Sequence, residues 1–249
     1  MLTFLLISLI YIHITYICYS LYIHRGLAHR AVVLHPVIQH IFRFWLWMTC
    51  GVYNKYKIAG HILHHRSADK INDPHSPHIS GKLEMLVYKP IKRIIGTFIS
   101  LPQTPYNNDK LIMPYLQKSL DSGYVFKYAR LGPITFLIVN LIIFGINGLW
   151  IYLTFLILSC FIAFTVGDGF THLFGYRNYN LNNRSHNLVP WGILMAGEEL
   201  HNNHHAHGNS AKFSKKWYEI DMGWVYIKLL MFFKLAQTKD RLSSTNSRT

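Results

Sequence analysis

Long segments without any charged residue limit what this chain can fold into. Residues 1–22 and 131–167 contain no Asp, Glu, Lys or Arg, so the 25 basic and 11 acidic residues all fall within 24–130 and 168–249. A helix of about 20 apolar residues is long enough to cross the hydrocarbon core of a bilayer. The first segment therefore predicts a span at about 1–22. The turn signal Gly145-Ile-Asn-Gly148 divides the second into a helical hairpin with spans at about 131–148 and 149–167.

The composition agrees with a membrane protein. Hydrophobic residues make up 51% of the chain and charged residues only 14%, whereas soluble domains carry about 25% charged residues. One span followed by a hairpin puts both charged regions on the same side of the membrane, which the positive-inside rule makes cytoplasmic. The net charge of +14 favours anionic lipid head groups or an anionic substrate as partners. Because the apolar content is so high, we expect no nucleic-acid partner.

Nine histidines form four short clusters beside these apolar segments. The clusters are His24 with His29, the triplet His61, His64 and His65, the single His172, and the triplet His201, His204 and His205. Neutral imidazole is a common ligand of iron, zinc and copper. Nine imidazoles are too many for one ion and suit two. The clusters therefore predict a membrane-embedded site for two metal ions, with di-iron as the favoured composition.

The spacing of the clusters predicts how they are arranged. Residues i, i+3 and i+4 share a helix face, so each triplet is expected to present three imidazoles to a common centre. Asp168 and His172 are also i, i+4, and Asp168 is expected to bind metal directly or through water. His24 and His29 lie about 140° apart on a regular helix. They are therefore expected either to serve different ions or to have the helix end between them.

Other polar residues near the clusters have expected supporting roles. Metal-bound imidazoles usually donate their second N–H to a carboxylate or a carbonyl. The candidate carboxylates are Asp73, Glu198, Glu199, Glu219 and Asp221. The remaining histidines are expected to be structural hydrogen-bonding groups; they are His13, His35, His40, His75, His78, His186 and His207.

Residues 34–52 have the hydropathy of a further span but contain His35, His40 and Arg43. A full crossing would put the first two histidine clusters on opposite faces of the membrane, so we expect a re-entrant or interfacial helix here.

The polar residues 238–249 are expected to form a disordered tail, leaving a single domain at 1–237. The predicted fold class is thus an all-α integral membrane protein with an N-terminal span, this helix, a transmembrane hairpin, and a cytoplasmic helical cap carrying the histidines.

At these residues the chain resembles the membrane-bound histidine-box fatty-acyl desaturases, particularly the short bacterial delta-9 type. The resemblance covers about residues 13–230. It is carried by YIHRGLAHRAVVLHP (22–36), GHILHHRSADKINDPHSP (60–77), HLFGYRNY (172–179) and NLVPWGILMAGEELHNNHHAHGNSAKFSKKWYEIDMGW (187–224). It implies that the nine clustered histidines hold two irons on the cytoplasmic side of a bacterial inner membrane. One departure is Asp168, where the family commonly has Asn.

The resemblance also implies a reaction and its partners. The expected reaction is oxygen-dependent desaturation of a saturated acyl chain to a cis monounsaturated product, with delta-9 as the family expectation. The substrate would be an acyl-CoA or an acyl-lipid, with Arg177, Lys212, Lys215 and Lys216 as candidates for contacting its head group. Electrons would come from a separate ferredoxin, flavodoxin or cytochrome with an NAD(P)H reductase. The alternatives are a hydroxylase, ketolase or alkane oxygenase with the same boxes or, more remotely, a membrane metal-binding or transport protein.

Overall fold

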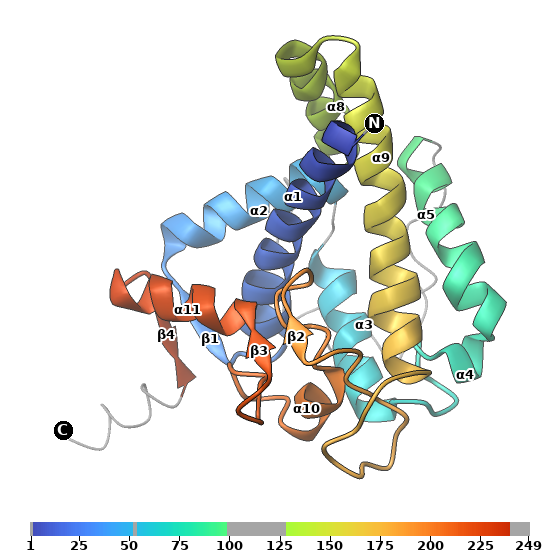
Figure 1. Cartoon of the computed structure of the whole chain (residues 1–249), viewed down its shortest axis with the longest axis vertical. Coiled ribbons are helices and arrows are strands. Elements are labelled where there is room, and N and C mark those ends of the chain that lie inside the picture. Colours follow the sequence, from blue (N-terminus) through green and yellow to red (C-terminus); the bar gives the residue numbers. More distant parts are fainter. Residues whose placement is uncertain (1, 52–53, 99–127, 240–249) are drawn as a thin grey trace.

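Two long helices form the axis of the computed structural model, which describes residues 2–51, 54–98 and 128–239 (Figure 1). The first joins α1 (Leu2–Cys18) to the π-helix η1 (Tyr19–Ala28). The second joins α9 (Asn147–Phe161), the π-helix η3 (Ile162–Gly169) and the 3₁₀ turn η4 (Phe170–His172). Both are long and apolar enough to cross a membrane. They pack together and run toward the same end of the molecule, so the histidines at their carboxyl ends meet there.

The predicted hairpin corresponds to α8 (Leu131–Phe144) and α9, which are joined at Gly145. Gly145 has a φ of 58°, in the left-handed region that glycine adopts without steric cost. The 14 residues of α8 span only about 21 Å, less than the roughly 30 Å of a hydrocarbon core. A complete span at 131–148 therefore stays a prediction, and residues 99–127 lie outside the described part of the chain.

The helix α2 (Pro36–Cys50) crosses the side of this bundle, within the segment predicted as re-entrant or interfacial (Figure 1). It begins at the cap residue His35 and ends at Gly51, which has a φ of 54°. Its 15 residues reach about 22 Å, which is too short for a straight crossing. Val37, Ile41 and Phe44 are exposed on one face, as expected for a helix that meets lipid. Its depth in a bilayer stays a prediction.

Close packing fixes α2 against α8. A Cβ atom on Gly132 of α8 would lie 1.9 Å from the carbonyl oxygen of Trp47 in α2. Only glycine allows the two backbones to approach this closely.

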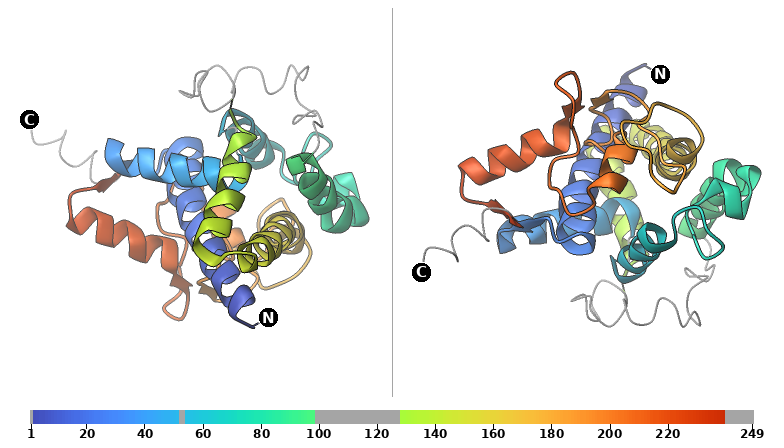
Figure 2. Two further views of the ribbon diagram at one scale, coloured as in Figure 1. Left: turned by 90° about the horizontal axis from the view of Figure 1, so that it is seen from above. Right: turned by 90° about the horizontal axis from the view of Figure 1, so that it is seen from below.

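The remaining helices lie around the two long helices (Figure 1). They are α3 (Asn54–Ser67), α4 (Pro77–Ser80), the π-helix η2 (Glu84–Tyr88), α5 (Lys89–Phe98), α10 (His201–Ala206) and α11 (Met222–Phe232). Seen from below, α10 lies near the centre of this end, beside α1 (Figure 2). Since α3 and α10 carry the two histidine triplets, their position assembles the site.

Two small sheets add to the helical fold and were not predicted. β1 (Val32–Leu34) pairs antiparallel with β4 (Ala236–Thr238), and β2 (Trp191–Gly192) pairs parallel with β3 (Ile220–Asp221). Thr238 lies opposite Val32, so the first residue of the predicted tail belongs to a strand. Residues 240–249 of that tail lie outside the described residues.

Candidate metal centre

The nine clustered histidines converge in two groups at the lower end of the bundle. Within each group, one ring nitrogen of every histidine lies within 4.8 Å of all the others. The five-histidine group consists of His24, His29, His61, His65 and His204, and the four-histidine group consists of His64, His172, His201 and His205. The expectation of four or five imidazoles for each of two ions therefore matches the geometry.

The two triplets are divided between the groups, contrary to the predicted common centre for each. His61 and His65 belong to one group while His64 belongs to the other, and His204 is likewise separated from His201 and His205. The reason is helical rotation of about 100° per residue. Residues i and i+4 are only about 40° apart, but i+3 lies about 60° to the other side. Each HxxHH helix therefore gives two imidazoles to one group and the third to its neighbour.

His24 and His29 belong to the same group, so the expectation of different ions is wrong; the helix ends at Ala28, between the two residues, as the other expectation had it. The helix does not keep the regular α geometry between them but is π-helical over Tyr19–Ala28. The backbone N–H of His29 donates to the carbonyl of His24 at 3.0 Å, which is the i→i+5 bond of a π turn. This turn places residues five apart on one side of the helix. The wider π turn is thus the reason why residues 24–29 can supply two imidazole nitrogens to one group.

Asp168 lies outside both groups, although it is four residues before His172. The chain passes from π-helix into a 3₁₀ turn between the two residues, so the i, i+4 relation of a regular helix does not hold. The Asp168 carboxylate instead accepts a hydrogen bond from Nδ1 of His75 at 2.8 Å. His75, expected to be structural, therefore lies beside the centre, and its ring contacts that of His64 with a centroid distance of 5.6 Å.

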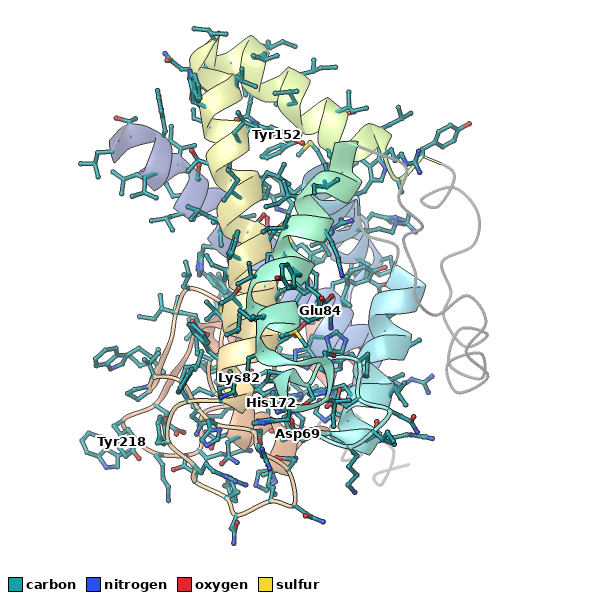
Figure 3. All side chains as sticks on the ribbon, turned by 90° about the vertical axis from the view of Figure 1, so that its right-hand side faces the viewer. Asp69, Lys82, Glu84, Tyr152, His172 and Tyr218 are labelled. Carbon is teal, nitrogen blue, oxygen red and sulfur yellow. The ribbon has the colours of Figure 1, made fainter. Side chains whose placement is uncertain are left out.

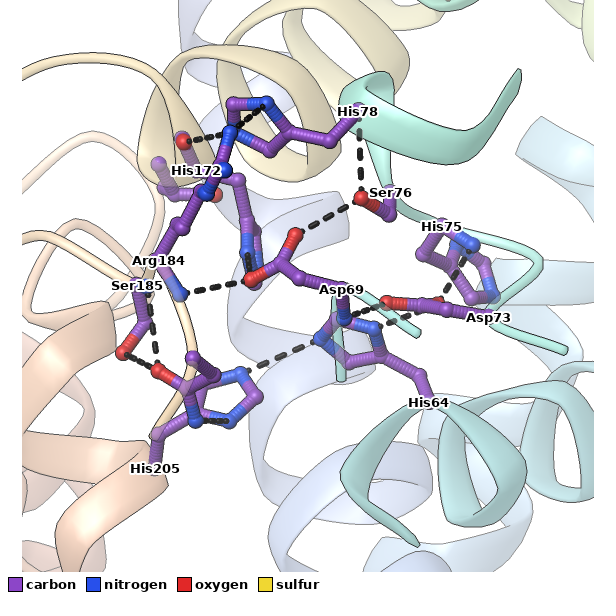
Figure 4. Close-up of polar contacts among 12 residues, drawn as sticks. His64, Asp69, Asp73, His75, Ser76, His78, His172, Arg184, Ser185 and His205 are labelled. Atoms are coloured by element: carbon purple, nitrogen blue, oxygen red, sulfur yellow. Dashed lines mark hydrogen bonds and ion pairs between the residues drawn. The ribbon is translucent and has the colours of Figure 1, made fainter. Parts of the chain in front are cut away.

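Three carboxylates orient the clustered imidazoles. Asp73 accepts from Nδ1 of His64 at 2.8 Å, and Glu198 lies 2.5 Å from Nδ1 of His24. Asp69 accepts from Nδ1 of His172 at 3.0 Å, and its other contacts are with Ser76 and the backbone of Arg184 (Figure 4). Asp73 and Glu198 were candidates from the sequence. Asp69 was missed, because no helical spacing links it to the distant His172.

The charges of these carboxylates follow from their contacts. Burial by itself raises the pKa of Asp69, but hydrogen bonds from His172, Ser76 and the backbone of Arg184 hold that pKa well below its ordinary value. Burial likewise opposes ionisation of Glu198, whereas His24 and Arg25 lower its pKa. Both groups are therefore ionised acceptors at neutral pH.

The other candidate carboxylates contact different partners. Glu199 accepts from the backbone N–H of Met195 at 2.8 Å, and burial raises its pKa to about 7. Glu219 accepts from Asn203, the residue before His204.

Asp221 pairs with Arg25 at 2.9 Å, and neither side chain is accessible to solvent. The Arg25 guanidinium also lies 3.8 Å from the centre of the Phe213 ring. This pair fastens η1 to the start of α11.

The imidazole nitrogens of the two groups are suited to bind metal ions. Because Nδ1 of His24, His64 and His172 faces a carboxylate, each Nε2 carries a lone pair directed inward. These Nε2 atoms lie 2.9 Å, 3.1 Å and 3.1 Å from the Nε2 atoms of His204, His205 and His201, respectively. Burial, and secondarily the neighbouring imidazoles, lower the pKa of His201, His204 and His205 well below its ordinary value. Converging neutral nitrogens of this kind fit one nitrogen-coordinated cation in each group.

Comparison with known proteins identifies the family. Residues 1–231 match the fatty acid desaturase family. The chain belongs to the fatty acid desaturase family. The sn-1 stearoyl-lipid 9-desaturase of Synechocystis sp. is 27% identical over 221 residues, covering 86% of this chain and 64% of that protein. The sn-1 stearoyl-lipid 9-desaturase of Anabaena variabilis is 26% identical, covering 86% and 75%. Delta-9 acyl-lipid desaturase 2 of Arabidopsis thaliana is 23% identical, covering 86% and 67%. The chain thus spans just under two thirds of the Synechocystis protein.

A cavity leads from the histidines of this desaturase-family chain along α1 and α9. Its lower end is lined by His24, His61, His64 and His201, and its upper end by apolar residues that include Ile12 and Leu156. His24 and Ile12 are 12 positions apart along the first helix. Arg177 and Lys212, the candidates for contacting a substrate head group, are exposed on the cap and do not line this cavity. Arg93 of α5 does line it, and the sequence offered no signal for this.

Proposed function

We propose that this member of the fatty acid desaturase family removes two hydrogens from adjacent methylenes of a saturated fatty-acyl chain to leave a cis double bond, at the delta-9 position. The observation that carries the proposal is the junction of a largely apolar cavity with the histidine groups, four of whose nine imidazoles line its lower end. A long apolar cavity suits an acyl chain. The names of the relatives support a lipid-bound acyl chain as substrate, and acyl-CoA is the alternative carrier.

The proposed cofactor is a pair of iron ions, with O2 as co-substrate. The five-histidine and four-histidine groups would each hold one ion, and when bound the pair would supply the oxidising power of O2. Asp69, Asp73 and Glu198 hold three of the imidazoles in the tautomer that presents Nε2. The cavity walls position one C–C bond and exclude water. Asp168 is held toward His75, so we assign it to the surroundings of the centre rather than to direct coordination.

The proposed cellular setting follows the charge distribution. We place the chain as a multi-pass protein of a bacterial inner membrane, folded as one domain over 1–237, with the histidine groups facing the cytoplasm. Every exposed charged side chain in the described residues is basic, which supports that side by the positive-inside rule. The histidines lie at the ends of the long helices rather than near their middle, which argues against a transporter.

The test is the fatty-acid profile of a bacterial host that lacks its own desaturase and expresses this chain in air. We expect a new cis monounsaturated acid, with the double bond located at delta-9 by mass spectrometry, and none from the His204→Ala variant. Separating lipid-bound from CoA-bound acyl chains identifies the carrier. A hydroxylated product would replace the proposal by an oxygenase of the same class. Absence of any product from an iron-loaded chain supplied with a chemical reductant would refute it.

A further inference from the structure

An exposed aromatic turn on the cap stands out from the rest of the surface. Trp217 is 95% exposed and its neighbour Tyr218 is 43% exposed. Their rings meet edge to face, with a centroid distance of 5.7 Å. Burying a Trp is worth several kcal/mol of apolar contact, and such residues dominate binding energy at protein interfaces. A tryptophan left almost wholly in solvent therefore marks a surface on which a partner can gain binding energy.

The turn is held rigidly although its tip is exposed. The backbone N–H groups of Lys215 and Lys216 both donate to Oε2 of Glu219, at 2.7 Å and 2.9 Å. The N–H of Glu219 closes the turn on the carbonyl of Lys216 at 3.1 Å. Directly after the turn, Ile220 pairs with Trp191 across the short β2–β3 sheet. A rigid surface presents its side chains without the entropic cost of ordering a loop on binding.

The charge around this turn is positive. Lys216, Lys212 and Arg177 are exposed on the same cap, whereas no Asp or Glu among the described residues is exposed. Glu219, the acidic residue within the turn, is buried. Such a surface attracts an acidic partner and raises its rate of encounter.

The turn is also connected to the five-histidine group by a short route. Trp217 and Tyr218 are followed in the chain by Glu219, whose Oε2 accepts a hydrogen bond from Nδ2 of Asn203 at 2.8 Å. Asn203 directly precedes His204, a member of that group. The route from the exposed ring to the imidazole therefore contains one noncovalent step. Figure 3 places Tyr218 on the outside of the lower end of the molecule, where His172 and Asp69 also lie.

From these observations we propose that the Trp217 turn (residues 215–219) is the docking site of an acidic one-electron carrier protein. This inference rests on the proposed function, which requires electrons from outside the chain. In each turnover two carrier molecules would lose one electron each. Those two electrons, two protons and the two hydrogens removed from the acyl chain together reduce O2 to two molecules of water. Small contact areas are typical of such transient redox encounters, as a single turn would provide.

The test measures reduction of the iron-loaded chain in detergent by two reductants in rapid-mixing experiments. One is a reduced [2Fe–2S] ferredoxin and the other is dithionite, which needs no docking site. We expect Trp217→Ala and Lys216→Glu each to slow reduction by ferredoxin about tenfold or more, because encounter is steered by charge and anchored by the ring. Both variants should keep the wild-type rate with dithionite. Raising the salt concentration should slow wild-type reduction by ferredoxin and affect Lys216→Glu less.

Two matched substitutions serve as controls. Trp150→Ala removes another exposed tryptophan, which is 54% exposed in the first turn of α9, far along that helix from the histidines. Lys70→Glu reverses an exposed charge in the turn that follows α3. Both should keep the ferredoxin rate. Equal loss in the controls, or no loss in the Trp217 and Lys216 variants, would overturn the inference. So would failure of both ferredoxin and flavodoxin to reduce the wild type.

Failure of the docking site and failure of the proposed desaturase function give different results. A chain that binds iron and is reduced by dithionite but forms no product would refute the proposed function instead. A Trp217→Ala variant that no longer binds vesicles of phosphatidylglycerol and phosphatidylethanolamine, but is reduced normally by ferredoxin, would reassign the turn to anionic lipid and refute the docking site.

Discussion

The buried pair of Arg25 and Asp221 allows a stability prediction to be worked out from individual contacts. Asp221→Asn keeps the size of the side chain and an acceptor oxygen but removes the charge that faces Arg25. Both side chains are inaccessible to solvent, so the Arg25 charge would be left buried without compensation. Breaking a buried pair in this way costs about 3–5 kcal/mol. We expect a loss of that size in the free energy of unfolding.

Asp221→Ala should lose more than Asp221→Asn, because the carboxylate makes two further contacts. It accepts from the backbone N–H of Phe213 at 2.7 Å and caps α11 by accepting from the N–H of Trp224 at 2.9 Å. Each such bond contributes about 1 kcal/mol. Alanine should therefore cost about 1 kcal/mol beyond asparagine, whose single amide oxygen can still accept one of these two bonds.

The assay is unfolding of the metal-free chain in mixed micelles with increasing denaturing detergent, followed by far-ultraviolet circular dichroism. Glu84→Gln is the matched control. Its pair with Lys92 has the same kind of N–O contact at 2.8 Å, but the lysine side chain is 64% exposed, so the loss should stay below about 1 kcal/mol. If Asp221→Asn cost no more than this control, the reasoning that a buried charge is left unpaired would be refuted.

Three further outcomes are expected. His172→Ala should lose the ion of the four-histidine group and keep the other, measured as iron per chain; loss of both ions would contradict independent groups. Asp168→Asn should leave iron content unchanged, whereas complete iron loss would reveal a carboxylate ligand. Burial opposes ionisation of Glu219, but hydrogen bonds from the Lys215 and Lys216 backbone, among others, hold its pKa below the ordinary value. Its contribution to stability is therefore present above the unfolded-state pKa and falls as pH drops through the folded-state pKa. Glu219→Gln should flatten this part of the curve of unfolding free energy against pH, and an unchanged acid limb would exclude the role.

The sequence predicted which histidines come together but not how they divide. The clusters were sufficient to select nine residues, and for the six in the two HxxHH segments the reason is that a helix puts these imidazoles on one broad face. Which imidazole faces which group depends on the angle between α3 and α10, and this is a property of tertiary packing. Spacing explains why His64 points apart from His61 and His65, but not that His64 joins His201 and His205 while His61 and His65 join His204.

Departures from regular helix geometry account for two other differences. The prediction for His24 and His29 assumed 100° per residue, and the π turn between them removes that assumption. The same is true of Asp168 and His172, which are separated by the change from π to 3₁₀ geometry. The contact of Asp69 with His172 joins residues 103 positions apart, so no local pattern could have revealed it. The two helices long and apolar enough to cross a membrane, by contrast, depend only on local apolar composition, which the sequence displays directly.

The distance along the chain between partners in the five-histidine group has a consequence for biogenesis. His24 lies near the start of the chain, and the imidazole it contacts, that of His204, follows 180 residues later. During synthesis the first helix can enter the membrane long before its partners have left the ribosome. Neither group of nitrogens is complete until α10 has been made. If ions bind these groups, filling of a complete group must therefore await α10, and a chain cut short before α10 would have neither group of nitrogens complete.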